Sequence, residues 1–145
     1  MIVTCPGCGK KNRSPADRLT EPGVCGACKT PISPVARPIE ADGEVFREVT
    51  KNAKVPVLVD FWAAWCGPCL RAAPEVARTA REMAGRAVVL KVDTEKHPEI
   101  AAEYGVQAIP NFAVIKGGQV LFRHAGLVGS AEMKAWLERA GATAA

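Results

Sequence analysis

One stretch of the sequence, residues 59–69, constrains the fold more than any other. It reads VDFWAAWCGPC: an apolar run leads into a Cys-x-x-Cys pair, and a helical pattern begins at Leu70. This order places Cys66 and Cys69 at the N-terminus of a helix, where unpaired backbone N–H groups and the positive end of the helix dipole favour an anion. Pro68 fits the first turn, because the N–H group that proline lacks would have no partner there. We therefore expect Cys66 to be a stabilised, nucleophilic thiolate.

The same spacing allows the two sulfurs to react with each other. Cys69 lies one helical turn after Cys66, so the pair can pass between dithiol and disulfide, with Cys66 attacking a target disulfide and Cys69 resolving the mixed disulfide. We expect the helix start to expose the first sulfur and bury the second. Half of a zinc site and a structural disulfide are the alternatives, but the preceding strand and the following helix favour the redox interpretation.

An acidic residue interrupts the apolar run that precedes the pair. Residues 55–62 are typical of a central strand covered on both faces, and Asp60 lies within them. A buried carboxylate is costly unless it has a partner or a task, and desolvation raises its pKa. Because side chains alternate along a strand, Asp60 points away from the face of Val59 and Phe61. Asp60 is thus a candidate functional residue; the alternative is a core aspartate satisfied by hydrogen bonds.

The motif Trp65-Cys66-Gly67-Pro68-Cys69 resembles the active-site segment of the thioredoxin family. The resemblance implies a reducing Cys66–Cys69 couple, in which Asp60 lies beneath the buried cysteine and handles its proton. It also implies that Lys91 accompanies Asp60, and that Pro110 follows a cis peptide bond and faces the cysteine pair. The backbone beside Pro110 would pair with a substrate chain. The family's apolar groove would be formed here by Trp65, Ile109, Gly126 and Leu127.

Two positions depart from the family pattern. Leu70 stands where many thioredoxins have a lysine, and Asn111 stands where threonine is common. The first departure could alter partner preference, but neither threatens the assignment to this class.

Four further cysteines form two more Cys-x-x-Cys pairs near the N-terminus. Residues 9–24 separate these pairs, a spacing that marks four-cysteine zinc sites, because each tight turn aims two sulfurs at one ion. So short a segment buries too little apolar surface to fold unaided, so metal ligation would supply its stability. Two local disulfides and a rubredoxin-like iron site are the alternatives. The predicted ligands of one zinc ion are Cys5, Cys8, Cys25 and Cys28.

Zinc-ligand pairs in front of a thioredoxin segment resemble the thioredoxin 2 subfamily. We expect a zinc-binding module in residues 1–32, a proline-containing linker in 33–41 and a thioredoxin domain in 42–145. Whether part of the linker forms a first strand is left open. The expected fold is α/β, a mixed central sheet flanked by helices behind a small zinc-ribbon-like domain. Its elements are helices from Asp42, at 67–85, at 98–104 and from Ser130, and strands at 55–62, 87–92, 112–116 and 119–123.

Composition narrows the classes of function. The 145 residues carry a net charge of +4, with scattered lysines and arginines that do not indicate nucleic-acid binding. The N-terminus does not resemble an export signal, and no apolar run is long enough to span a membrane, so we expect a cytoplasmic protein without membrane association. His97 and His124 lack ligand-spaced neighbours and are expected to be surface or packing residues. Zinc is the only expected cofactor besides the redox disulfide, and we expect a monomer.

The sequence therefore predicts a protein-disulfide reductase. Its substrates would be disulfide-containing proteins, and the resemblance implies a thioredoxin reductase as electron donor. An oxidase or isomerase on the same fold is the nearest rival, although those enzymes usually carry other residues between the cysteines. A zinc-dependent binding or holding module with a secondary redox pair is the rival from another class.

Overall fold

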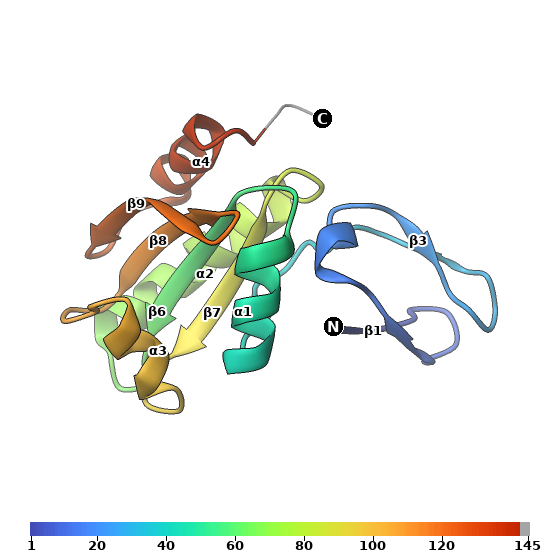
Figure 1. Ribbon diagram of the computed structural model, residues 1–145, viewed down its shortest axis with the longest axis horizontal. Helices are drawn as coiled ribbons and strands as arrows, with labels where there is room; N and C mark the ends of the chain where they lie inside the picture. The colour runs from blue at the N-terminus through green and yellow to red at the C-terminus, as the bar shows by residue number, and fades with distance from the viewer. Residues whose placement is uncertain (143–145) are drawn as a thin grey trace.

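The computed structural model describes residues 1–142. The N-terminal part forms two antiparallel hairpins and one short 3-10 helix, which lie beside the rest of the chain (Figure 1). The elements are β1 (Ile2–Thr4), β2 (Lys11–Arg13), η1 (Ala16–Arg18), β3 (Gly23–Val24) and β4 (Pro31–Ile32). We call residues 1–32 the zinc module, after the zinc site that the sequence predicts there.

The remaining chain builds one five-stranded mixed sheet with the order β5-β7-β6-β8-β9. Strands β5, β7 and β6 are parallel, and β8 and β9 run antiparallel to them as a hairpin. Their bounds are β5 (Ile39–Glu40), β6 (Val57–Trp62), β7 (Val88–Asp93), β8 (Asn111–Lys116) and β9 (Gln119–Ala125). Because β5 lies inside the segment expected to be linker, the sheet begins earlier in the chain than residue 42.

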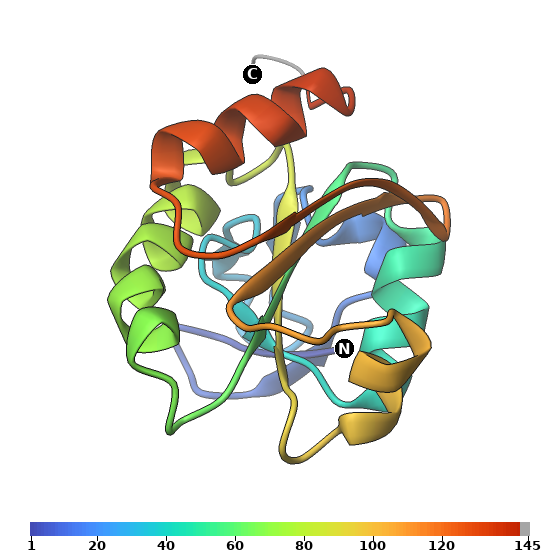
Figure 2. The same cartoon turned by 90° about the vertical axis from the view of Figure 1, so that its left-hand side faces the viewer.

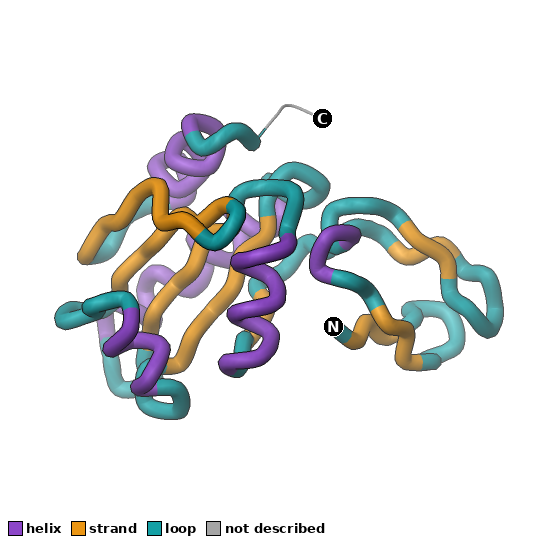
Figure 3. The backbone as a smooth tube through the Cα atoms, viewed as in Figure 1, coloured by secondary structure: helices purple, strands orange, loops and turns teal. Residues whose placement is uncertain are grey.

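Helices cover both faces of this sheet, giving three layers (Figures 2 and 3). Helices α1 (Gly43–Asn52) and α3 (Pro98–Glu103) pack on one face, and α2 (Gly67–Glu82) and α4 (Ser130–Arg139) on the other. Alternation along β6 sends Val59 toward α1 and Leu58 toward α2. Asp60 therefore shares the face of α2, the helix that begins at the cysteine pair.

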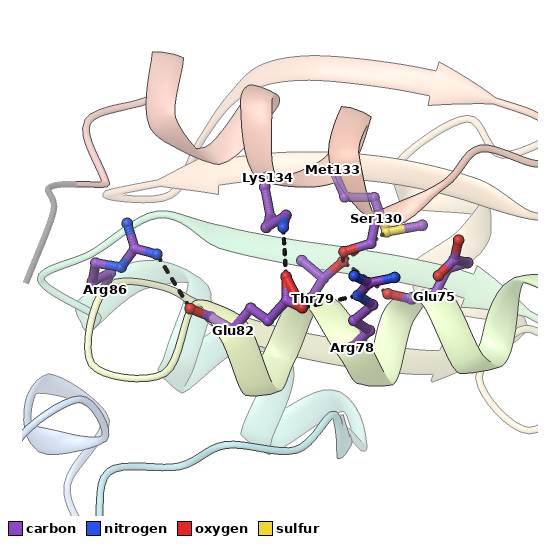
Figure 4. A network of polar contacts seen from close by, with 8 residues as sticks. All are labelled: Glu75, Arg78, Thr79, Glu82, Arg86, Ser130, Met133 and Lys134. Carbon is purple, nitrogen blue, oxygen red and sulfur yellow. Dashed lines mark hydrogen bonds and ion pairs between the residues drawn. The ribbon is translucent and has the colours of Figure 1, made fainter.

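A polar network fixes α4 against α2 (Figure 4). Thr79 Oγ1 on α2 lies 3.0 Å from Ser130 Oγ on α4, and both side chains are buried. Glu82 accepts hydrogen bonds from Arg78, at 2.8 Å, and from Lys134. The prediction that Ser130 caps α4 is wrong: Gly129 is the N-cap residue, and the Ser130 side chain is used between the helices.

The zinc module does not have an apolar core of its own. Its Ile2 and Val24 are exposed, whereas Ala16 and Leu19 are buried in the same core cluster as Phe46 on α1. The module is thus attached to the rest of the chain by apolar packing of the η1 region on α1.

Helix and turn boundaries follow local chemistry. The helix expected over 67–85 ends at Glu82, with Met83 as C-cap residue. The β8–β9 hairpin turns at Gly117 and Gly118, whose φ angles of 58° and 80° match a type I′ turn. Within residues 1–142, no helix combines the length and apolar character needed to cross a membrane.

Candidate active site and metal centre

The first turn of α2 holds the redox pair. Cys66 is the N-cap residue, and its sulfur accepts a hydrogen bond of 3.2 Å from the backbone N–H of Cys69. The two cysteines are joined in a disulfide, with their Cα atoms 5.2 Å apart. Gly67 and Pro68 form the start of the helix between them. A negative charge on Cys66 would therefore face the N–H groups and positive dipole end of α2.

The expected difference in exposure between the two cysteines is wrong for the disulfide form. Cys66 is 4% exposed and Cys69 is 3% exposed, because Ala63, Trp62 and Ile109 pack around both. What distinguishes the two residues is position: Cys66 accepts the capping bond, and its sulfur lies 3.7 Å from the carbonyl oxygen of Ile109.

Asp60 lies in the sheet on the α2 face, as the alternation along its strand predicts. It is 1% exposed, and its Oδ1 has no hydrogen-bond partner in the described chain. Desolvation raises the pKa of Asp60 to about 7; the positive charge of Lys91 opposes this rise, and the negative charge of Glu40 adds to it. The carboxyl group can therefore exchange a proton near neutral pH.

Lys91 stands beside Asp60 in the strand register but forms its ion pair elsewhere. Its Nζ lies 3.9 Å from Glu40 Oε1 and 4.3 Å from the ring centroid of Trp62. Glu40 is not predictable from the local sequence pattern, because it lies in the segment expected to be linker. Only the pairing of β5 with β7 brings it to the site.

The backbone beside the cysteine pair is shaped by Pro110. The Ile109–Pro110 peptide bond is cis, and the Pro110 carbonyl oxygen accepts a 2.9 Å hydrogen bond from Gly126. Asn111, the next residue, is buried, and its Oδ1 has no partner among the described residues. Ile109, a predicted groove residue, therefore lies beside Cys66, and Gly126, another, is bonded to Pro110.

Large apolar side chains lie exposed on the segments that flank the pair. Trp65, Leu70 and Leu127 are 69%, 54% and 47% exposed. The Trp65 indole N–H donates a 2.7 Å hydrogen bond to Glu95, a second contact that the sequence did not indicate. This bond orients an otherwise exposed ring next to Cys66.

The four remaining cysteines converge in the zinc module. All their sulfurs lie within 4.8 Å of one another, with Cys5 and Cys28 3.6 Å apart and Cys8 and Cys25 3.7 Å apart. These four are free thiols, so the two local disulfides considered from sequence are not present. Tetrahedral Zn–S bonds of about 2.3 Å place ligand sulfurs roughly 3.8 Å apart, so the donor set fits a four-cysteine zinc site.

Two matching turns present these sulfurs. In the first turn, Cys5 accepts a 3.0 Å backbone hydrogen bond from Gly9, and in the second, Cys25 accepts one of 3.1 Å from Lys29. Gly9 and Lys29 both have left-handed backbones, with φ angles of 76° and 64°. The repeated geometry aims each pair of sulfurs at one point.

Polar groups around the second pair of cysteines favour thiolates there. Backbone N–H groups of Cys28 and Ala27 and the Asn12 side chain lower the pKa of Cys25 to about 5. The side chain of Thr30, 2.9 Å from the Cys28 sulfur, lowers the pKa of Cys28. The roles of Asn12 and Thr30 could not be read from cysteine spacing, because Asn12 comes from the other hairpin. Deprotonated sulfurs are the form that zinc binds.

Comparison with known proteins agrees with this geometry. A sequence profile described as thioredoxin matches residues 37–139. The chain belongs to the thioredoxin family. A second profile, described as the N-terminal part of thioredoxin 2, matches residues 4–30. The family, the fold and the four-cysteine cluster expected from the sequence are thereby confirmed.

Individual thioredoxins are similar over most of the chain. Thioredoxin C-3 of Corynebacterium nephridii is 35% identical over 139 residues, which is 96% of this chain and 94% of that protein. A mutant thioredoxin from Halobacterium salinarum superposes with a TM-score of 0.68 at 28% identity, covering 76% of this chain and 96% of that chain. Chloroplastic thioredoxin z superposes with a TM-score of 0.67 at 28% identity, covering 75% of this chain and 98% of that chain. The protein is accordingly a thioredoxin-type thiol-disulfide oxidoreductase.

Proposed function

We propose that this thioredoxin reduces disulfides in other proteins through its Cys-Gly-Pro-Cys dithiol couple. The observation that carries the proposal is the arrangement of three groups: the pair at the N-terminus of α2, the buried Asp60 on the same face, and the Pro110 backbone beside Cys66.

The first step uses Cys66. Its thiolate attacks one sulfur of the substrate disulfide, a new Cys66–substrate bond forms, and the other substrate sulfur leaves as a thiolate. The N-terminus of α2 stabilises the attacking anion, and the backbone beside Pro110 offers strand-like hydrogen bonds to the substrate chain. Trp65, Ile109 and Leu127 supply apolar surface for that chain.

The second step uses Cys69 and Asp60. The Cys69 thiol transfers its proton to the Asp60 carboxylate, and the resulting thiolate attacks the Cys66 sulfur and releases the reduced substrate. Two electrons have then passed to the substrate, and the Cys66–Cys69 disulfide seen in the structure is the product. An external two-electron donor must reduce it again, and we assign this role to a thioredoxin reductase.

Within this proposal, residues 42–145 with β5 form the catalytic domain, and residues 1–32 bind one zinc ion. The role of zinc is structural, with redox sensing as the second candidate: oxidation of the four thiolates to disulfides would eject the metal and reshape the module. Free thiols in this module fit a reducing compartment such as the cytoplasm.

A trapping experiment tests the redox roles. Cys69→Ser should attack and stall as a mixed disulfide, whereas Cys66→Ser should capture nothing. Identification of the captured proteins would give the targets. Equal capture by both variants would contradict the assigned order of attack.

Metal analysis tests the zinc assignment. The Cys66→Ser/Cys69→Ser double variant should retain about one equivalent of zinc, because its four ligands are untouched. If peroxide releases zinc from the wild type while activity and target capture stay unchanged, the sensing role fails and the structural role stands.

A further inference from the structure

Three charged side chains lie in one row across the sheet. The strand register pairs Glu40 on β5 with Lys91 on β7, and Lys91 with Asp60 on β6. Residues in register on parallel neighbouring strands project to the same face. Glu40, Lys91 and Asp60 therefore share the α2 face, and Lys91 stands between a carboxylate that is 62% exposed and one that is buried.

Within the described residues, Lys91 forms an ion pair with Glu40 and not with Asp60. Its side chain is 17% exposed, its ion pair in the described chain is with Glu40 at 3.9 Å, and its ammonium lies over the Trp62 ring. Asp60 Oδ1 is left without a partner. A buried carboxylate normally attracts a nearby ammonium, and the contacts of Lys91 with Glu40 and Trp62 compete with that attraction.

We propose that Glu40 is a positioning residue for the resolving step: its carboxylate holds the Lys91 ammonium away from Asp60, so that Asp60 remains a strong enough base to accept the Cys69 proton. Pairing of Lys91 with Asp60 would stabilise the charged carboxylate and weaken it as a proton acceptor. This inference rests on the proposed role of Asp60 in proton transfer.

The surroundings of Asp60 leave few other groups to set its protonation. Lys91 comes from β7 and Glu40 from β5, and these are the charges that act on it. Strand β8 places the apolar Phe112 in register with Asp60. The cysteine pair lies at the start of α2, a helix that packs on the same face of the sheet. Strand β5 follows the zinc module directly in the chain. Glu40 therefore comes from outside the Cys-x-x-Cys segment at residues 59–69.

Glu40→Gln in the full-length, zinc-loaded protein tests the proposal. Nuclear magnetic resonance of the Asp60 carboxyl carbon in the oxidised state should show its titration midpoint move to lower pH by about 0.5–1 unit, because Lys91 turns toward Asp60. The rate of insulin-disulfide reduction rises with pH on its acid side, and this rise should move to lower pH in the same way. The plateau rate at higher pH should fall roughly two- to threefold, because Asp60 is then a weaker base. Mixed-disulfide formation in a Cys69→Ser background should keep its rate, since the first attack does not use Asp60.

Matched variants separate this role from a general charge effect. Glu44→Gln removes the same charge from an exposed site on α1 and should move neither the midpoint nor the acid limb. Glu40→Asp keeps the charge and should restore most of the wild-type profile. In a Lys91→Met background only the direct charge of Glu40 is left to act on Asp60, so Glu40→Gln should move the Asp60 midpoint by a clearly smaller amount; an equal shift there would show that Glu40 acts without Lys91 and would overturn the proposal.

Asp60→Asn distinguishes failure of this inference from failure of the proposed function. If Asp60→Asn slows turnover while Glu40→Gln leaves both the midpoint and the pH profile unchanged, the inference about Glu40 is wrong and the role of Asp60 stands. If Asp60→Asn turns over like wild type at neutral pH, the proposed proton transfer itself is wrong.

Discussion

The zinc module and the catalytic domain use the same Cys-x-x-Cys spacing for different chemistry. In the module, each pair lies in a turn that reverses into a hairpin strand, so the two pairs meet and four sulfurs converge. In the catalytic domain, the chain continues into α2, so the single pair caps a helix, and the Cys66 sulfur lies 3.7 Å from the carbonyl oxygen of Ile109. The structure that follows the second cysteine decides between a metal site and a redox site.

The two regions also differ in what stabilises them. The module has strands of two or three residues and leaves Ile2 and Val24 exposed, so we expect its fold to depend on ligation of a metal. The catalytic domain has a five-stranded sheet with apolar clusters on both faces. We therefore expect changes at the sulfurs to affect activity in one region and folding in the other.

The largest expected difference comes from one serine substitution in each region. Cys66→Ser should abolish disulfide reduction and leave zinc content at wild type, because it removes the nucleophile alone. Cys25→Ser should reduce zinc content strongly and leave most of the reductase activity. Insulin reduction and metal analysis on both variants check this pair, and loss of reduction in Cys25→Ser would show that the module completes the active site.

Asp60→Asn should show that the buried carboxylate lowers the free energy of unfolding of the catalytic domain at neutral and alkaline pH. The folded-state pKa of Asp60 is about 7, raised from the ordinary value of 3.8. Below the ordinary value both states are protonated and burial of the carboxyl carries no charge penalty. As pH rises toward 7 the unfolded chain ionises first, so the free energy of unfolding falls. The asparagine variant should thus be more stable than wild type at pH 8, by about 2–4 kcal/mol, and similar near pH 4. Urea unfolding at both pH values measures this; a gain that is equal at both would assign it to packing.

Removal of zinc should have a smaller effect on the catalytic domain. Chelation unfolds the module and removes the packing of Leu19 on α1, which should cost the domain about 2 kcal/mol and lower its Tm by roughly 5–10 °C. Leu19→Ala should lower Tm similarly with zinc still bound. Chelation of Leu19→Ala should then add little, since the same contacts are already lost. A further full decrease on chelation would mean that the module stabilises the domain through other contacts.

Local patterns were enough to predict the class of fold, but not the contacts between distant segments. The Cys-x-x-Cys spacings, the apolar run around Asp60 and the Gly117-Gly118 turn are local signals with direct physical meaning. Glu40 was missed because its role depends on strand register between β5 and β7, which no short pattern encodes. Ser130 was wrongly predicted to be the N-cap residue, because a serine at a helix start fits the capping pattern by sequence alone. The pattern does not show that a neighbouring helix supplies another partner, here Thr79.

The smallest expected effect tests whether the two turns of the zinc module are equivalent. Gly9 and Lys29 occupy the same position in their turns, and both have left-handed φ angles, which cost a residue with a Cβ atom about 1 kcal/mol or more. Part of the gain from glycine is offset by its greater freedom in the unfolded chain. Lys29→Gly should therefore strengthen zinc binding about two- to fivefold, equivalent to about 0.5–1 kcal/mol, measured by competition with a chelator.

Lys29→Ala, which removes the 3.4 Å contact of the lysine with the Gly26 carbonyl oxygen but keeps a Cβ atom, should give no gain. If Lys29→Gly weakens zinc binding, the lysine side chain contributes more to the second turn than its backbone conformation costs, and the two turns are not equivalent.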